Sequence, residues 1–340
     1  CRFYGFCGIQ LVKFSVIIPL YNKAPYIAST IESVLAQTFT DFEVIVVDDG
    51  STDRSAELVA AITDSRLRLI RRSNAGVSVA RNCAITMALG EWIAFLDGDD
   101  WHHPCHLATL LVAQKKHPEA DTVACDFLAV PPDVALDLAH CWPALSDEPD
   151  VELVTDLPRR WMSGPALFTG AVAVRSARLA QMQPCFVPGE SQGEDLDLWF
   201  RLAEQSPIAI VHAPSVARRV AVSGSLSARH DTSIVPPWIS RMQIRARSGA
   251  LTPSQRESAL WFVAQSKVTL ARQAVASNRR LEGVRWLFEG WRASIGLRWW
   301  LTAAMVFLMP GRVVTKWEHW RINRTVPVLM LDTVRSGSSP

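Results

Sequence analysis

Residues 14–22 have the sequence FSVIIPLYN. The run 14–19 is apolar and rich in β-branched residues, which is typical of a strand buried on both faces of a parallel sheet. A helix is expected next, because Pro25 suits a first helical turn and apolar residues recur at helical spacing over 27–35. This stretch therefore predicts the first strand and helix of an α/β fold.

Strand and helix patterns alternate through the first hundred residues. Further strands are expected at 43–47, 67–70 and 92–96. Helices are expected at 53–62 and from Gly76, with Gly90 as the glycine cap of the second helix. This alternation predicts a mostly parallel central sheet flanked by helices, which binds ligands at the carboxyl ends of its strands.

The rest of the chain divides by composition. Five prolines among acidic residues predict a loop-rich insertion at about 130–165. Strand signals return at 166–174 and 207–211 around a helix that begins near Gly193, and the chain is expected to be helical after Pro236. We therefore expect four parts: a leader without assigned role at 1–12, an α/β catalytic domain at 13–235, a helical C-terminal region at 236–328 and a flexible tail at 329–340.

Composition excludes several classes of protein. The chain has 340 residues, enough for one α/β core and a smaller appended unit, and a net charge of +2 that is too small for a nucleic-acid binder. Its seven cysteines form no C-x-x-C pair, which indicates reduced thiols and a cytoplasmic protein. The first residues lack the apolar run of a signal peptide, and the uncharged run 299–309 is shorter than the roughly 20 residues of a membrane span.

Three carboxylates follow the fourth predicted strand. Asp97, Asp99 and Asp100 offer the hard oxygen ligands that Mg²⁺ or Mn²⁺ prefers. Such an ion would neutralise the charge that develops on a diphosphate leaving group. An exposed acidic turn is the alternative, but the position after a strand favours a metal site.

Two further clusters follow the first and second strands. Asp48 or Asp49 is expected to accept an N–H of a nucleobase, as uracil offers at N3, whereas Asp53 is assigned to capping the next helix. Tyr21 is expected to stack on the base, with a tyrosine at the edge of the core as the alternative. Its neighbours Pro19 and Asn22 are expected to lie in the same nucleotide-sugar site, as is Gly98 of the third cluster.

Arg81 and Asp195 complete the candidate site. Arg81 is expected to pair with phosphates or to orient Asp97, with a solvent-exposed arginine as the alternative. Asp195, beside Glu194, opens the helix after Gly193 and is the candidate general base that takes the proton of an acceptor hydroxyl. A carboxylate that only favours the start of the helix is the alternative for Asp195.

Taken together, five segments closely resemble, in order and spacing, the inverting family 2 glycosyltransferases with a GT-A fold, of the type that builds bacterial surface polysaccharides. The segments are SVIIPLYN, VIVVDDGSTD, NAGVSVARN, FLDGDD and GEDLDLWFRL, and the resemblance covers about residues 14–227. It implies that Tyr21 and Asp49 hold the base, that Asp97 and Asp99 form the DxD motif for ribose and metal, and that Asp195 is the catalytic base.

The resemblance also implies a reaction. A hexosyl or N-acetylhexosaminyl group would pass from a nucleotide-diphosphate-sugar, expected to be a UDP-sugar, to a hydroxyl of a glycan or lipid-linked acceptor, in a single in-line displacement with inversion. Ser225 and Ser227 lie in a segment similar to the loop that closes over diphosphate and acceptor. Before that loop, Ala217, Arg218 and Arg219 replace the aromatic residues usual in the family.

Segment 279–324 is rich in arginine and contains six of the 13 tryptophans. This composition predicts a helix in a membrane interface, which would make the protein peripheral on the inner face of the plasma membrane. The alternative is a helical subdomain that packs its tryptophans against the catalytic domain or a second subunit.

Three other classes of function are the alternatives. A sugar nucleotidyltransferase would need a glycine-rich, basic loop after the first strand, which PLYNKAPY does not supply. A dinucleotide-dependent oxidoreductase would need G-x-G-x-x-G at the same place. A non-catalytic nucleotide-sugar-binding protein stays open, and the Asp195→Asn variant distinguishes it from an enzyme.

Overall fold

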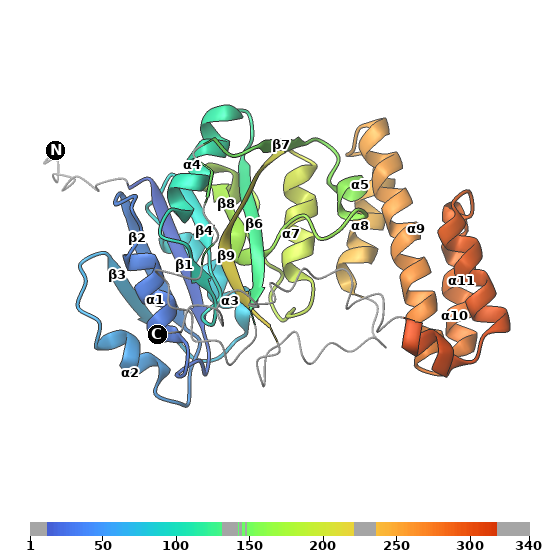
Figure 1. Ribbon diagram of the computed structural model, residues 1–340, viewed down its shortest axis with the longest axis horizontal. Helices are drawn as coiled ribbons and strands as arrows, with labels where there is room; N and C mark the ends of the chain where they lie inside the picture. Colours follow the sequence, from blue (N-terminus) through green and yellow to red (C-terminus); the bar gives the residue numbers. More distant parts are fainter. Residues whose placement is uncertain (1–11, 131–141, 143–144, 147, 221–235, 318–340) are drawn as a thin grey trace, which may run out of the picture. The chain divides into compact units, whose positions relative to one another are not determined.

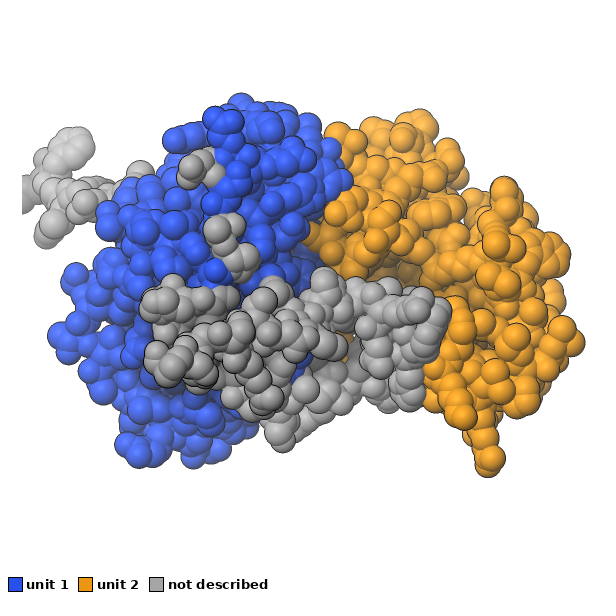
Figure 2. All heavy atoms as spheres, viewed as in Figure 1, with its two compact units in different colours: residues 1–154, 167–191, 206–220 blue, residues 155–166, 192–205, 221–340 orange. Residues whose placement is uncertain are grey.

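The computed structural model describes residues 12–130, 142, 145–146, 148–220 and 236–317. The chain forms two compact units, coloured separately in Figure 2. The first unit contains residues up to 154 with 167–191 and 206–220, and the second contains 155–166, 192–205 and the chain from 221 onward. The helix that begins at Glu194 therefore belongs with the C-terminal helices.

The first unit is built on a nine-stranded sheet within the described residues (Figure 1). The strand order is β3-β2-β1-β4-β8-β6-β9-β5, and β7 pairs with β9. The strands are β1 (Phe14–Leu20), β2 (Phe42–Asp48), β3 (Leu67–Arg71), β4 (Trp92–Phe95), β5 (Trp101–His102), β6 (Thr122–Val130), β7 (Val151–Val154), β8 (Val172–Arg175) and β9 (Ile208–Arg219).

The sheet is mixed rather than mostly parallel. Strands β3, β2, β1 and β4 run parallel to one another, as predicted, and their apolar residues form the main core. Beyond them, β8 is antiparallel to both β4 and β6, and β9 is parallel to β6 but antiparallel to β5 and β7. The α/β class is confirmed, and the prediction of a mostly parallel sheet is corrected in its second half.

Helices of the first unit pack apolar faces against this sheet. They are α1 (Ile27–Leu35), α2 (Ser55–Ala60), α3 (Val77–Met87), α4 (His106–Lys116) and α6 (Ser176–Ala180), with a 3₁₀ turn η1 (Thr169–Ala171). The expected glycine cap of α3 was wrong, because the residue after this helix is Ala88, in an extended conformation. Gly90 instead lets the chain pass against β1, since a Cβ there would lie 2.6 Å from the carbonyl carbon of Phe14.

The region predicted as a loop-rich insertion contains regular structure. Strand β6 extends to Val130, and β7 and the helix α5 (Leu157–Trp161) follow within the same region. The strand expected at 207–211 continues to Arg219, because the irregular pairing of β6 and β9 near Pro214 accommodates a residue that cannot donate a ladder hydrogen bond. The strand expected at 166–174 is confined to β8, with η1 before it.

The second unit is helical, as predicted for the chain after Pro236. Helix α9 has a capping box formed by Thr252 and Gln255, and α8, α10 and α11 pack against α9. None of the described helices combines the length and apolar character needed to cross a bilayer. Besides α5, the described helices of the second unit are α7 (Glu194–Ala203), α8 (Pro237–Arg247), α9 (Pro253–Ala276), α10 (Arg280–Glu289) and α11 (Leu297–Leu308), with a 3₁₀ turn η3 (Trp291–Ala293).

Candidate functional site

The carboxyl ends of β1, β2 and β4 meet at one edge of the sheet. These strands are parallel neighbours, so the clusters that follow them lie beside one another. The N–H of Asp49 donates to the carbonyl of Leu20 at 2.8 Å, and the N–H of Leu96 donates to the carbonyl of Ile17 at 3.1 Å. The structure therefore brings together the three predicted clusters of the first unit.

Asn22 joins the loop after β1 to the turn after β2. Its side-chain carbonyl accepts hydrogen bonds from the N–H groups of Thr52 at 2.8 Å and Asp53 at 3.3 Å, and its own N–H donates to Ser51 Oγ at 3.0 Å. Asn22 has a φ of 50°, a value that asparagine tolerates better than most residues. The neighbouring Tyr21 is 47% exposed, which leaves part of its ring open for stacking on a base, and that role stays a prediction.

Asp49 anchors the loop that opens α3. Its carboxylate accepts hydrogen bonds from the N–H of Ala75 at 3.1 Å and the N–H of Gly76 at 2.7 Å, and Arg72 Nε lies 3.2 Å from Oδ1. Asp49 is buried, and Gly76 has a φ of 94°. The N–H of Ala75 also lies 3.1 Å from Oδ2, so these donors already contact both carboxylate oxygens, and acceptance of a base N–H by Asp49 stays a prediction.

Asp48 and Asp53 shape the turn between β2 and α2. Asp48 Oδ1 accepts the N–H of Ser51 at 3.0 Å. Asp53 accepts the N–H of Ser55, the first residue of α2, at 2.9 Å and the N–H of Ala24 at 3.1 Å. The predicted cap was wrong by one residue, because Arg54 occupies the N-cap position and its side chain makes no capping hydrogen bond. Burial would raise the pKa of Asp53, but these hydrogen bonds together lower it below its ordinary value.

Arg81 orients Asp97 from helix α3. An Arg81 guanidinium N–H donates to Asp97 Oδ1 at 2.7 Å, and the guanidinium lies 5.2 Å from the centre of the Phe186 ring. The Arg81 side chain is 5% exposed, whereas that of Asp97 is 30% exposed. Arg81 is therefore not the solvent-exposed arginine of the alternative, and Asp97 stays accessible to a ligand.

Lys23 pairs with Asp99, a contact that sequence reasoning missed. The Lys23 ammonium lies against Asp99 Oδ2, and its stem passes Gly98. A Cβ on Gly98 would lie 3.4 Å from the carbonyl oxygen of Pro19 and 3.6 Å from Lys23 Cγ. Gly98 thus lets the acidic turn lie close to the end of β1. There the Lys23 ammonium already balances the carboxylate of Asp99.

Asp100 attaches the acidic turn to β9. It is 2% exposed, and Oδ1 accepts the N–H of Arg219 at 2.7 Å. Burial and the neighbouring Asp99 and Asp97 raise its pKa well above the ordinary value of an aspartate. Asp100 therefore has a structural bond in place, which leaves Asp97 and Asp99 as the better candidates for metal ligands.

The described residues contain no preformed metal centre. Among them, no group of three or more His, Cys, Asp or Glu side chains could hold a metal ion. Asp97 and Asp99 nevertheless fit a metal that is shared with a ligand. They lie two residues apart on one turn, Asp97 is partly exposed, and each is paired with one cation, so phosphate oxygens would have to supply other ligands.

Arg219 is a second contact that sequence reasoning missed. Its guanidinium lies 3.9 Å from the centre of the Trp101 ring and 4.6 Å from that of Tyr26, and Nε donates to the carbonyl of Asp99 at 3.3 Å. The one available signal was the departure from the aromatic pattern at 217–219. An arginine stacked on aromatic rings takes that place and holds the acidic turn.

Two buried histidines lie directly after this turn. The rings of His102 and His106 stack at 3.9 Å, His102 Nε2 lies 3.0 Å from the carbonyl of Gly170, and His106 Nδ1 lies 2.9 Å from Ser215 Oγ. Burial lowers the pKa of His102 to about 4 and that of His106 well below its ordinary value. Both rings are therefore neutral near pH 7 and serve as packing groups.

In the second unit, Asp195 lies in the first turn of α7, as predicted. Gly193 has a φ of 72°, and a Cβ there would lie 2.6 Å from Trp238 Cδ1, so only glycine fits this helix start. Glu194 is buried, and Asp195 Oδ1 accepts the N–H of Leu196 at 2.8 Å. Asp195 is half-buried and therefore more accessible than Glu194, and its role as general base stays a prediction.

Two predictions about the site are not settled by these contacts. The approach of Asp195 to Asp99 stays a prediction, because the two residues belong to different units. Ser225 and Ser227 lie outside the described residues, as do the predicted leader through residue 11, the tail at 329–340 and the last part of 279–324.

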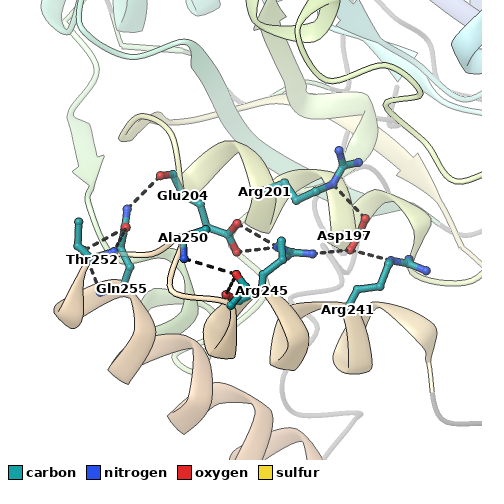
Figure 3. Close-up of polar contacts among 9 residues, drawn as sticks. Asp197, Arg201, Glu204, Arg241, Arg245, Ala250, Thr252 and Gln255 are labelled. Atoms are coloured by element: carbon teal, nitrogen blue, oxygen red, sulfur yellow. Dashed lines mark hydrogen bonds and ion pairs between the residues drawn. The ribbon is translucent and has the colours of Figure 1, made fainter.

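Asp197 fastens α7 to α8 (Figure 3). This aspartate is 2% exposed and accepts hydrogen bonds from Arg201 Nε at 3.0 Å, Arg241 Nε at 3.2 Å and an Arg245 terminal nitrogen at 3.3 Å. Arg245 Nε also donates to Glu204 at 3.0 Å, and burial raises the pKa of Glu204 despite that arginine. Three guanidinium groups around one buried carboxylate hold the helix that carries Asp195.

Comparison with known proteins identifies the domain that carries the acidic turn. Residues 15–140 match the family described as Glycosyl transferase family 2. They form a family 2 glycosyltransferase domain. This domain contains β1, β2, β4 and the clusters that follow them, whereas α7 and Asp195 come later in the chain.

Curated relatives share this part of the chain. The uncharacterized glycosyltransferase EpsJ of Bacillus subtilis is 41% identical over 115 residues, which cover 33% of each chain. The uncharacterized glycosyltransferase YibD of Escherichia coli is 44% identical over 101 residues, which cover 29% of each chain. The match thus spans about a third of the length of these relatives.

A solved structure supports the fold of the glycosyltransferase domain and the helices around it. TarS 1–349 of S. aureus, crystallised in complex with UDP-GlcNAc, superposes with a TM-score of 0.65 at 19% identity. The alignment covers 92% of this chain and 92% of that chain. The predicted GT-A fold is therefore confirmed.

Proposed function

We propose that this chain transfers a hexosyl or N-acetylhexosaminyl group from a nucleotide-diphosphate-sugar to a hydroxyl of a glycan or lipid-linked acceptor, with inversion. The observation that carries the proposal is the meeting of Tyr21, Asp49 and the Asp97–Asp99 turn at one sheet edge within a family 2 domain. A UDP-sugar is the favoured donor, because TarS was crystallised with UDP-GlcNAc.

The donor would lie along this edge. The exposed ring of Tyr21 offers a stacking surface for the base, and Asp49 offers an acceptor for a base N–H. Asp97 and Asp99 would hold Mg²⁺ or Mn²⁺ together with diphosphate oxygens, and that ion would offset the charge that develops as the glycosidic bond breaks. Lys23 adds a second positive charge at the same place.

Asp195 is the proposed general base. It would accept the proton of the acceptor hydroxyl as that oxygen attacks the anomeric carbon from the side opposite the diphosphate, which inverts the configuration. Ser225 and Ser227 are proposed to close over diphosphate and acceptor. We place the reaction at the inner face of the plasma membrane, where a lipid-linked acceptor would be found.

The test is release of UDP from UDP-sugars by the purified full chain, with and without Mn²⁺. We expect Asp195→Asn to abolish turnover while donor binding, followed by thermal shift, is kept. Asp99→Asn should remove the Mn²⁺-dependent part of donor binding. The matched control is Asp41→Asn, an exposed aspartate away from this edge, which should behave like the wild type.

Each alternative function predicts a different result. Unchanged turnover in Asp195→Asn would remove this residue from the mechanism. Donor binding without sugar release by any acceptor mixture would favour a non-catalytic binding protein. Formation of a nucleotide-sugar from a nucleoside triphosphate and a sugar phosphate would identify a nucleotidyltransferase instead.

A further inference from the structure

Large apolar side chains are exposed mainly in one part of the second unit. Among the described residues, the large apolar side chains that are at least about a third exposed lie between Leu281 and Val313. The exceptions are Tyr21, Leu89 and Ile244. The segment contains α10, η3 and α11, drawn at the red end of the colour scale in Figure 1. Such a concentration of exposed apolar side chains in one segment indicates an interaction site.

Helix α11 is apolar on two opposite faces. Its inward face carries Met305 and Val306, which are buried in a core with residues of α9 and α10. The outward face consists of Leu297, Trp300, Leu301, Phe307 and Leu308, which recur at helical spacing and are 53–80% exposed. We call these five residues the outer face of α11.

Several polar groups at the two ends of α11 are satisfied within the protein. Trp300 Nε1 donates to the carbonyl of Ser294 at 2.9 Å, so this indole can leave water without losing a hydrogen bond. At the other end of the helix, the Arg280 guanidinium donates to the carbonyls of Val306 and Met309. The outer face can therefore enter an apolar phase without leaving those backbone groups unpaired.

The border of the outer face is positively charged. Arg292, in η3 just before α11, and Arg312 and Lys316, just after it in the chain, are exposed, and no acidic partner is found for them among the described residues. The two glutamates of the region are already paired, Glu282 with Arg279 and Glu289 with both Lys267 and Arg285. A second copy of this border would be repelled, whereas anionic lipid headgroups would be attracted.

We propose that the outer face of α11 docks this chain onto an anionic membrane surface. The five apolar side chains enter the headgroup region, and Arg292, Arg312 and Lys316 contact lipid phosphates. The proposal deepens the proposed function by naming the surface on which a lipid-linked acceptor is met. Only the link to a lipid-linked acceptor depends on the proposed function, because docking itself needs neither donor binding nor turnover.

Vesicle co-sedimentation of the full chain tests the proposal. We expect binding to vesicles of phosphatidylglycerol and phosphatidylcholine, weak binding to phosphatidylcholine alone, and release by added salt. Replacing Leu297, Leu301 and Leu308 together by glutamine should weaken binding by about tenfold or more. The matched control is Ile244→Gln, an exposed isoleucine on α8, which should leave binding unchanged.

Charge is tested separately from apolar contact. Arg292→Gln and Arg312→Gln should each weaken vesicle binding by about fivefold, since one cation near an anionic surface contributes on the order of 1 kcal/mol. Arg256→Gln, an exposed arginine on α9, is the control. All substituted side chains are exposed, so circular dichroism and thermal melting should match the wild type.

Three outcomes would overturn the docking proposal. They are equal binding to neutral and anionic vesicles, wild-type binding by the triple glutamine variant, and self-association through α11, seen by light scattering, that vesicles do not displace. UDP release with a water-soluble acceptor is measured in parallel. Turnover without vesicle binding rejects the docking alone, and vesicle binding without turnover rejects the proposed function alone.

Discussion

Replacing Asp197 by asparagine should destabilise the second unit strongly. Asp197 is 2% exposed and serves as the common acceptor for Arg201, Arg241 and Arg245. Asparagine keeps an acceptor oxygen but loses the charge, so three guanidinium groups are left without their counter-ion. Breaking a buried ion pair by removing one partner costs about 3–5 kcal/mol.

The lower end of that range applies here. The three arginine side chains are 19–29% exposed and keep part of their hydration, and Arg245 keeps its bond to Glu204. We therefore expect a loss of about 3 kcal/mol in the free energy of unfolding. Urea unfolding followed by tryptophan fluorescence should show a midpoint about 1 M lower, for a slope of about 3 kcal/mol per molar.

Asp195→Asn is the matched control, because it makes the same chemical change two residues earlier on α7. Its free energy of unfolding should stay within about 0.5 kcal/mol of the wild type, while turnover is lost. The two variants would then separate the carboxylate that stabilises the helix from the one proposed to act on the acceptor. An Asp197→Asn protein that unfolds like the wild type would refute the stabilising role of the network.

Three further predictions concern the first unit. Lys23→Met should raise the affinity of the donor-free protein for Mn²⁺, measured by calorimetry, because the ammonium no longer competes for Asp99; a lower affinity would contradict this. Gly90→Ala should cost about 1–3 kcal/mol in urea unfolding, since its Cβ would meet the backbone at Phe14, and a neutral effect would argue against that close approach. The pKa of His102 is about 4 in the folded chain against an ordinary 6.5, so the unfolded chain takes up the proton first, and stability is lost as pH falls from about 6.5 to about 4 by up to about 3 kcal/mol. The urea midpoint of His102→Gln should fall less steeply over that range, and an unchanged slope would count against this assignment.

The parallel half of the sheet could be predicted because its strands are encoded locally. The run at 14–19 is apolar except for Ser15, and turn residues mark where the strand stops. The other half depends on distant pairing. The short strand β7 lies between prolines and forms against β9, and β9 itself contains Pro214, so neither pattern stands out in the sequence.

The same distinction holds for the candidate site. Asp49 and Asp97 stand directly after predicted strands, so topology alone places them on one edge. Lys23 and Asp99 are 76 residues apart in sequence, and Arg219 and Asp100 are 119 residues apart. Nothing in the local sequence marks such partners, because a single lysine or arginine is compatible with many exposed positions.

Helix α3 links the two ends of the proposed donor site mechanically. Asp49 grips the backbone where this helix begins, and Arg81, farther along the same helix, sets the direction of Asp97. A nucleobase that shifted Asp49 would therefore also shift α3 and, through Arg81, the carboxylate of Asp97, which is proposed to lie near the diphosphate. In the proposed reaction, the choice between bases would then act through the reactivity of the phosphate end as well as through how firmly the base is bound.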